Sequence, residues 1–452
     1  MPLHGLPFAP VLACLLVAGT GFANEQDAQP DTTVRTEPAA KPRIATQASS
    51  RMDADATPAS ATIKAIRVLE QRVGDDPENF AVQNMLAGYY LKQVKQSGDH
   101  AYLAPAAAAA RASLAAVPAE RNHGGLAALA LTEAASHQFV AARDHAQRLV
   151  ALAPDKLYPY EILGDALLEL GQYEEAAAAY GRVERMGGAS TSILTRLGRL
   201  ALLNGRTVDA RSRFEQSLAL ALDDATVAED VIAWCHWQLG DTAFSTGEYA
   251  TAERHYHDAL TTTPDFLPAL TALGRVRAAR GDLTAAIAAY ERAIGIDPMP
   301  VFVAALGDLY ALAGRHAEAA GQYASILEDG RNELDAQLDN RQLVMFYADH
   351  DLKGDEAYRL AAAEYRTRRD IYGADAAAWT ALKAGKIAEA QATIADALRL
   401  GTQDARLLYH AGMIARAADA KTTGKAYLKR ALALNPEFDP LQAKIARAAL
   451  ND

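Results

Sequence analysis

The chain has 452 residues, of which 50% are apolar and only 7% aromatic. This composition suits closely packed helices better than sheets, which favour β-branched and aromatic residues, so we expect an all-α fold. The formal net charge is -11, and acidic and basic residues are interspersed without a block of Lys or Arg. Because phosphate binding needs a concentrated basic face, nucleic acid is disfavoured as a partner. Two cysteines, Cys14 and Cys235, cannot form a disulfide framework.

The N-terminus is typical of a secretory signal. Residues 8–18 form an apolar run that is too short to span a bilayer, and small residues precede a cleavage point after Ala23. We therefore expect a signal peptide at 1–23 and a periplasmic or secreted bacterial protein. A second interpretation stays open, because the sequence "VLAC" resembles a lipobox ending at Cys14, which would attach the protein to a membrane by a lipid.

Residues 24–61 are rich in Ala, Thr, Pro, Gln and Ser. Such a segment has too little apolar surface to offset the entropy lost on ordering, so it is predicted to be a disordered linker. The remaining chain, residues 62–452, is dominated by internal repetition.

Two stretches in the middle of the chain, 238–266 and 272–300, align without a gap, so their landmarks recur at one constant period. A small residue is needed where two helices approach closely, a bulky residue fills the space beside it, and proline ends the second helix. The residue types at these landmarks agree with two closely packed helices, the second of which ends at a proline. The matched landmarks are Leu239-Gly240 with Leu273-Gly274, Gly247 with Gly281, Ala252 with Ala286, Tyr256 with Tyr290, Ala259 with Ala293, and Pro264 with Pro298.

This unit resembles the tetratricopeptide repeat, a helix-turn-helix of about 34 residues with small residues at positions 8, 20 and 27 and a proline at 32. About ten units follow one another from Thr62 to Leu450, and the stretch from Glu333 to Tyr372 is the least regular. Because one unit cannot bury its own apolar face, its neighbours must supply the core. The resemblance implies a right-handed α-solenoid with a concave groove.

The C-terminal part of the chain also resembles a widespread group of exported bacterial tetratricopeptide proteins. The segments that carry this resemblance are "FYADHDLKGDEAYRLAAAEYRTRRDIYGADAAAW" and "ALRLGTQDARLLYHAGMIA". This second resemblance implies the fold and export, and it implies no activity.

The sequence contains no familiar catalytic or cofactor-binding motif, since H-E-x-x-H, C-x-x-C, G-x-S-x-G and G-x-x-x-x-G-K-[ST] are all absent. His255 and His257 point to opposite sides of a helix, so they cannot share a metal ion, and we expect one at the surface and one half-buried. Cys235 and His236 also face different directions, and Cys235 is expected to be partly buried and inert. We therefore predict no enzyme activity, no metal and no cofactor.

In the tetratricopeptide superfamily the first helix of each unit lines the concave face, chiefly through positions 2, 5, 9, 12 and 13. Carried over to this chain, the resemblance implies a groove that combines aromatic residues with charges of both signs. The Lys and Asn clamp of the chaperone-binding subgroup is absent at positions 5 and 9, so a chaperone-tail receptor is not expected. The implied groove residues are Glu161, Asp165, Arg199, Trp234, Trp237, Asp241, Phe244, Arg275 and Asp308.

Trp234 and Trp237 leave two interpretations open. The segment Leu218–Ala233 is longer than the period allows, so the two rings either line the groove or pack between helices. Trp and Arg often dominate binding interfaces, which favours the groove. Our first hypothesis is a non-catalytic scaffold that binds a protein or peptide in this groove. The alternative is an assembly subunit of a cell-envelope machine for secretion or polysaccharide export, held near a membrane if the N-terminal segment is retained or lipidated.

Overall fold

The computed structural model describes residues 58–328 and 340–451. Within these ranges the chain forms 22 α-helices, one turn of 3-10 helix and no strand, which confirms the predicted all-α class. The predicted signal peptide (1–23) and nearly all of the predicted linker (24–61) lie outside the described residues. The first helix begins at Pro58, shortly before the predicted start of the repeats at Thr62.

The described chain divides into two compact units, 58–128 and 129–451, whose boundary falls within one helix. The elements of the smaller unit are α2 (Pro58–Asp75), α3 (Phe80–Ser97), η1 (His100–Tyr102), α4 (Leu103–Ala116) and the start of α5 (His123–Ala135). Asn79 caps α3, because its side-chain oxygen accepts a hydrogen bond from the backbone N–H of Val82 at 3.2 Å. That the whole of 62–452 forms one array stays a prediction.

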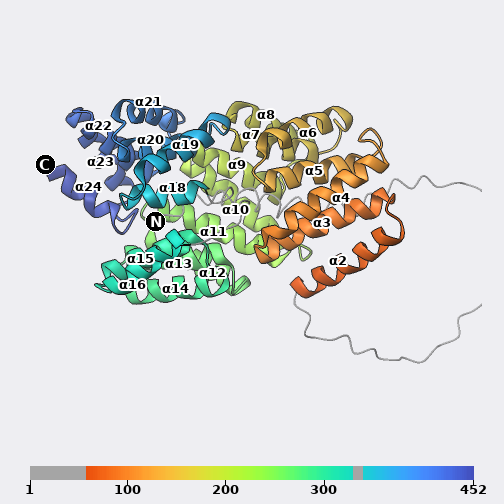
Figure 1. Ribbon diagram of the computed structural model, residues 1–452, viewed down its shortest axis with the longest axis horizontal. Coiled ribbons are helices and arrows are strands. Elements are labelled where there is room, and N and C mark those ends of the chain that lie inside the picture. The colour runs from red at the N-terminus through yellow and green to blue at the C-terminus, as the bar shows by residue number, and fades with distance from the viewer. Residues whose placement is uncertain (1–57, 329–339, 452) are drawn as a thin grey trace, which may run out of the picture. The chain divides into compact units, whose positions relative to one another are not determined.

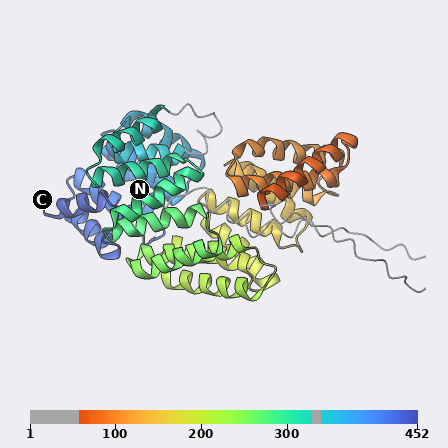
Figure 2. The ribbon, with the colours of Figure 1, turned by 90° about the horizontal axis from the view of Figure 1, so that it is seen from below.

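The larger unit is a succession of helical hairpins (Figure 1 and Figure 2). Its helices after α5 are α6 (Phe139–Leu152), α7 (Tyr158–Glu169), α8 (Tyr173–Gly187), α9 (Thr191–Leu203), α10 (Thr207–Asp223), α11 (Glu229–Ser245), α12 (Tyr249–Thr262), α13 (Leu267–Ala279), α14 (Leu283–Ile296), α15 (Pro300–Leu312), α16 (His316–Glu328), α18 (Asn340–Asp349), α19 (Gly354–Thr367), α20 (Ile371–Lys383), α21 (Ile387–Leu398), α22 (Ala405–Ala417), α23 (Lys421–Leu434) and α24 (Gln442–Asn451). Each helix packs mainly on its neighbours in the chain, as in the hairpins α11–α12 and α22–α23.

The glycine and tyrosine landmarks of the repeat pack against each other between the two helices of a hairpin, as predicted. A Cβ atom added at Gly164 on α7 would lie 2.4 Å from a ring carbon of Tyr180 on α8. At the equivalent position of a later hairpin, a Cβ atom at Gly240 would lie 2.5 Å from a ring carbon of Tyr256. Only glycine therefore lets these helices approach closely enough to bury the tyrosine ring, and Tyr180 and Tyr256 are both fully buried.

Three turns of the larger unit are covered by segments from much later in the chain. A Cβ atom added at Gly171, between α7 and α8, would lie 2.3 Å from the carbonyl oxygen of Arg369. One added at Gly205, between α9 and α10, would lie 2.4 Å from the carbonyl oxygen of Gly401. Gly247, between α11 and α12, lies beside Pro436. We call these contacts the seam, and they place the starts of α20 and α22 and the segment before α24 against the earlier hairpins.

Hydrogen bonds join the two sides of the seam at each of the three turns. The backbone N–H of Ile371 donates to Tyr173 Oη at 2.9 Å. The Thr402 hydroxyl donates to the carbonyl of Leu203. Asn435 Nδ2 donates to the carbonyl of Phe244 at 2.8 Å. The turn between the two helices of a hairpin is therefore contacted by a later segment of the chain in three successive hairpins.

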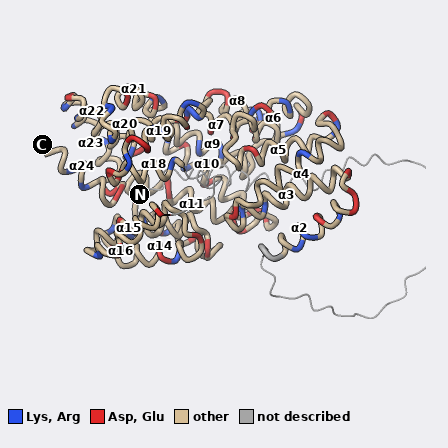
Figure 3. The backbone as a smooth tube through the Cα atoms, in the orientation of Figure 1, with Lys and Arg blue, Asp and Glu red and all other residues tan. Residues whose placement is uncertain are grey.

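Acidic and basic residues are interspersed along the described helices, as the sequence suggested (Figure 3). Among the described residues, no helix combines the length and the apolar character needed to cross a membrane.

Candidate binding site

The carboxylates predicted for the groove lie in a repeated, largely buried pattern. Asp165 on α7 accepts hydrogen bonds from Arg196 Nε and Nη2 on α9, both at 2.8 Å. The hydroxyl of Tyr180, on the partner helix α8, donates to the same carboxylate at 2.7 Å. The carboxylate thus joins its own hairpin to the next one.

Two later hairpins repeat this arrangement. Asp241 on α11 pairs with Arg275 on α13 and with the hydroxyl of Tyr256. Arg275 also stacks over the Phe244 ring, with the guanidinium carbon 4.2 Å from the ring centroid. The predicted groove residues Asp241, Phe244 and Arg275 therefore come together and contact one another inside the stack.

Asp308 on α15 forms the third case, with His350 in place of arginine. Its carboxylate lies 2.8 Å from His350 Nε2 and accepts a hydrogen bond from Tyr323 at 2.7 Å. Burial is the largest single influence and would raise the pKa of Asp308, but the hydrogen bonds from His350 and Tyr323 and the charge of His350 contribute to a net lowering of the pKa. Burial would lower the pKa of His350, and Asp308 raises it instead. Each group therefore favours the charged form of the other.

The remaining charged groove candidates also have partners. Glu161 accepts a hydrogen bond from Ser192 at 2.6 Å, and Arg199 donates to Glu169 at 2.8 Å. Glu169 lies in the seam, where Arg368 forms a second ion pair with it. Burial would raise the pKa of Glu169, but Arg368 and Arg199 lower it below its ordinary value of 4.5.

The two tryptophans pack between helices. Trp234 is 4% exposed and Trp237 is 7% exposed, and their ring centroids lie 6.2 Å apart in an edge-to-face arrangement. The ring centroid of Phe214 on α10 lies 6.3 Å from that of Trp234, also in an edge-to-face arrangement. Of the two interpretations left open by the sequence, this burial favours the core.

Most of the nine candidate groove residues are buried in the described chain. Trp234, Trp237, Phe244 and Arg275 are all buried, because neighbouring hairpins cover them. Glu161 and Asp308 are buried as well, whereas Asp165, Arg199 and Asp241 remain partly accessible. Whether any of the nine binds a partner stays a prediction.

Cys235 lies next to these rings and is fully buried. Its sulfur is 3.4 Å from the hydroxyl of Ser217, and burial raises the pKa of the thiol to about 11. A thiol with this pKa holds very little thiolate at neutral pH, in keeping with the predicted inert cysteine. The predicted contrast between the two histidines of α12 is also confirmed, since His255 is half-buried and His257 is exposed.

A pocket of about 500 Å³ opens at the first turn of the seam. We call it the arginine pocket, because four guanidinium groups and one carboxylate line it. Its lining comes from α6, from the turn between α7 and α8, and from the ends of α19 and α21, and consists of Val140, Arg143, Leu170, Gly171, Gln172, Arg366, Thr367, Arg369, Asp396 and Arg399.

Contacts with the backbone and with aromatic rings orient these arginines. Arg399 Nη2 donates to the carbonyls of Arg369 at 2.8 Å and Gly171 at 3.2 Å, so it ties the two sides of the seam together. Arg369 lies over the Tyr365 ring at 4.8 Å and contacts Asp396 at 3.3 Å.

The excess of positive charge in the pocket is left largely unneutralised by its lining. Arg143 pairs with Asp144 at 2.7 Å, outside the lining, and Arg366 has no ion-pair partner among the described residues. Arg366, Arg369 and Arg399 are exposed.

Comparison with known proteins agrees with the hairpin geometry. Residues 163–225 and 238–298 match the tetratricopeptide repeat. These two segments belong to the tetratricopeptide repeat superfamily. They span α7 to α14, and the other helices of the larger unit continue the same succession of hairpins.

Solved structures similar to this tetratricopeptide protein include that of MamA, at 26% identity and a TM-score of 0.30 over 37% of this chain and 93% of that one. PilW, a type IV pilus biogenesis factor, is 17% identical with a TM-score of 0.41 over 48% of this chain and 99% of PilW. A tetratricopeptide repeat protein from Parabacteroides merdae is 17% identical with a TM-score of 0.41 over 55% and 97%. Among curated proteins, none matches this chain.

Sequence reasoning placed no functional residue in the arginine pocket. Its arginines are scattered over residues 143–399, in different tetratricopeptide units, and none stands at a position that lines the groove in the superfamily. The clustered "RTRRD" at 366–370 was the one signal available, because three of its five residues are basic.

Proposed function

We propose that this tetratricopeptide protein is a non-catalytic scaffold that captures an acidic segment of a partner protein in the arginine pocket. Tetratricopeptide repeat proteins bind protein or peptide partners and are generally non-catalytic. The observation that carries the proposal is the excess of four guanidinium groups over one carboxylate in the lining of this pocket. It occurs in a chain whose net charge is -11, so the local charge is opposite to that of the whole.

The chemistry of the lining selects carboxylates. Guanidinium groups bind carboxylates through two parallel hydrogen bonds, and such charge-assisted bonds are roughly twice as strong as neutral ones. The exposed heads of Arg366 and Arg369 keep donors available, while contacts to ring and backbone hold Arg369 and Arg399 in place. The volume of about 500 Å³ suits several side chains of an extended peptide rather than a whole folded surface.

Binding of short labelled peptides to the full chain tests the proposal by fluorescence anisotropy. A Glu-rich peptide should bind, and its Gln-rich counterpart should not. The double variant R366A/R369A should weaken binding at least about tenfold, which corresponds to about 1.4 kcal/mol.

The matched control is R292A/R430A, which removes the same charge from two exposed arginines outside the pocket. This control should bind like the unmodified chain. Equal weakening in both double variants would mean that net charge alone attracts the peptide, and the pocket assignment would be wrong.

Export is part of the same proposal. It is supported by the apolar run and the small residues of segment 1–23, and the scaffold would then act in the periplasm or outside the cell. Sequencing the N-terminus of the mature protein tests this. A start at Asn24 supports a soluble exported scaffold, a lipid-modified Cys14 supports the membrane-attached envelope-machine subunit, and an intact Met1 contradicts both.

A further inference from the structure

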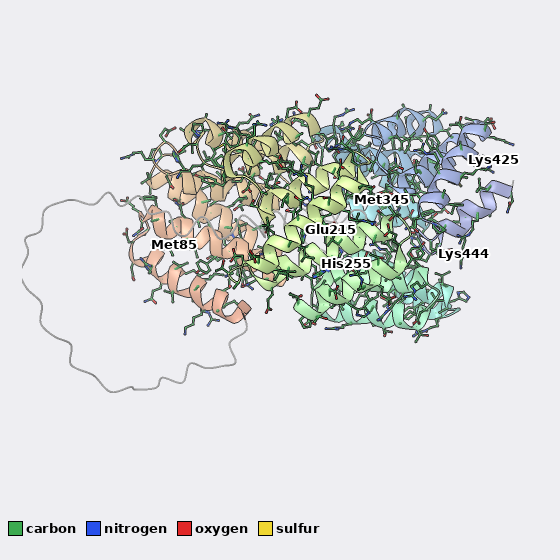
Figure 4. The ribbon with its side chains drawn as sticks, turned by 180° about the vertical axis from the view of Figure 1, so that it is seen from behind. Met85, Glu215, His255, Met345, Lys425 and Lys444 are labelled. Atoms are coloured by element: carbon green, nitrogen blue, oxygen red, sulfur yellow. The ribbon has the colours of Figure 1, made fainter. Side chains whose placement is uncertain are left out.

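The hairpin formed by α11 and α12 brings together two histidines from different helices. His236 is on α11 and His255 is on α12, and their Nδ1 atoms lie 3.3 Å apart. Asp258, one turn after His255, places a carboxylate oxygen 3.8 Å from His236 Nδ1. Figure 4 labels His255 on its helix in the middle of the larger unit. One ligand atom from each of the three residues lies within 4.8 Å of the others.

We propose that His236, His255 and Asp258 bind a divalent transition-metal ion, with zinc as the ion to test first. Ligand atoms about 2.0–2.1 Å from a tetrahedral zinc ion lie about 3.3–3.4 Å from one another. The two Nδ1 atoms lie 3.3 Å apart, which equals the distance expected between two ligand atoms of a tetrahedral zinc ion. The Asp258 oxygen lies 3.8 Å from His236 Nδ1 and within 4.8 Å of the His255 ligand atom, so rotation of this side chain, which is 43% exposed, must bring it closer to both.

The donor set and its surroundings fit such an ion. Imidazole nitrogen and carboxylate oxygen are common zinc ligands, and three protein ligands leave one position for water or for a partner's side chain. Burial lowers the pKa of His236, and burial together with Arg254 lowers the pKa of His255 to about 4. Two arginines act on the site: Arg254, whose Nη1 lies 4.0 Å from the Asp258 carboxylate and whose side chain is 61% exposed, and Arg211, whose charge also lowers the pKa of His255.

The next tetratricopeptide unit shows what the same positions hold without such a site. One repeat later, Leu270 replaces His236 and Ala289 replaces His255, and both are buried apolar residues. Arg292 stands in place of Asp258 and pairs with Asp265. The fold therefore needs only an apolar contact at this point. Two imidazoles and a carboxylate at the same point are consequently a feature of this one unit rather than of the repeat.

The sequence pattern gave no sign of this cluster because it relates neighbouring residues only. Along the sequence, His255 stands two positions from His257 and His236 stands next to Cys235, and neither pair can share a metal ion. The structure joins His236 to His255 across the hairpin, on adjoining faces of two helices.

Zinc binding to the full chain can be measured by isothermal titration with ZnCl2 after treatment with a chelator. Cobalt(II) provides an independent readout, because a tetrahedral site with nitrogen and oxygen ligands gives visible absorption bands. One zinc ion per chain is expected, with a rise in the melting temperature, since an ion that binds only the folded state stabilises it. H257A should bind zinc as the unmodified chain does.

The double variant H236L/H255A carries the residues of the next unit and should retain the fold, which circular dichroism checks. It should lose the cobalt absorption and weaken zinc binding at least about tenfold, and D258N should weaken it by a smaller factor. If a folded H236L/H255A bound zinc as tightly as H257A does, the metal site would be refuted and the two imidazoles would simply share a hydrogen bond. This outcome is independent of the arginine pocket, which lies on other helices.

Discussion

The turns at Gly171 and Gly281 are alike in sequence and in backbone, but their surroundings differ. Both glycines follow the first helix of a tetratricopeptide unit and have positive φ, +75° at Gly171 and +86° at Gly281. Gly171 lies against the backbone of Arg369 and Asp370, whereas nothing lies within 4 Å of a Cβ atom placed at Gly281. Gly314 is as open as Gly281, and Gly205 is covered like Gly171.

The comparison shows that the repeat fixes the shape of a turn but not what covers it. Covering comes from tertiary contacts between residues such as Glu169 and Arg368, which are 199 positions apart. The arginine pocket exists only at a covered turn, because Arg143 and Gln172 come from one side of the seam and Arg366 and Arg369 from the other. A hairpin with an uncovered turn therefore only stacks on its neighbours, whereas a hairpin with a covered turn can also contribute to a pocket.

The largest effect is expected from removing the buried cation of the seam. R368M leaves the carboxylate of Glu169 buried with Arg199 as its remaining partner, and should lower the free energy of unfolding by about 3–5 kcal/mol. Chemical denaturation measures it. The matched variant at an open turn is R315M, which removes an exposed ion pair with Glu318 and a contact with the Tyr310 ring, and should lower stability far less than R368M. Equal effects of the two substitutions would remove the distinction between covered and open turns.

Alanine at the turn glycines should produce the next largest effect. G281A forces a Cβ atom into the left-handed region and should cost about 1–2 kcal/mol. G171A incurs the same cost and also pushes the backbone of Arg369 away, so a total of about 3 kcal/mol is expected. Thermal unfolding compares the two variants directly. Identical melting temperatures would show that nothing presses on Gly171.

A smaller effect is expected from pH. The pKa values of Glu169 and Asp370, both in the seam, are lowered by the arginines beside them even though burial alone would raise them. The folded state therefore binds fewer protons than the unfolded state, and the stability from these groups is present above their ordinary values of 4.5 and 3.8. It is lost as the pH falls through the lowered values. Denaturation at several pH values should show that the free energy of unfolding falls less steeply with decreasing pH in E169Q than in the unmodified chain. The same pH dependence in both proteins would contradict the role of Glu169.

The smallest perturbation is a chemical probe of Cys235, which leaves the folded chain unchanged. Because the thiol is buried and its pKa is raised to about 11, labelling by a thiol reagent at pH 8 should be slow in native protein and fast in denaturant. Rapid labelling of native protein would mean that α11 opens readily, and that the packing around the two tryptophans is looser than the structure shows.

The local part of the fold could be predicted from the sequence. Glycine beside tyrosine at a fixed spacing, as at Gly240 and Tyr256, specifies a close contact between adjacent helices, and such contacts repeat with the period. The groove residues were less predictable. The superfamily register gives the helix face of Asp165 and Asp241, but Arg196 and Arg275 on the next hairpins neutralise both carboxylates.

The candidate sites could not be predicted because each depends on a contact that the period does not encode. Arg143 and Arg399 reach one pocket only through the seam, and His236 meets His255 only across a hairpin. A sequence shows which residues carry charge, but pairing between distant units depends on how the hairpins curve and stack. A scattered set of arginines therefore gives little sign of a pocket before the fold is known.

A double-mutant cycle between Glu169 and Arg368 tests the seam most directly. E169Q, R368M and the double variant are each unfolded by denaturant, after circular dichroism has shown that all three remain helical. Because the two side chains form a buried ion pair, their effects should fail to add by more than about 1 kcal/mol, with the double variant more stable than the sum predicts. Effects that add within about 0.5 kcal/mol would show that the two residues do not meet, and would contradict both the seam and the arginine pocket built on it.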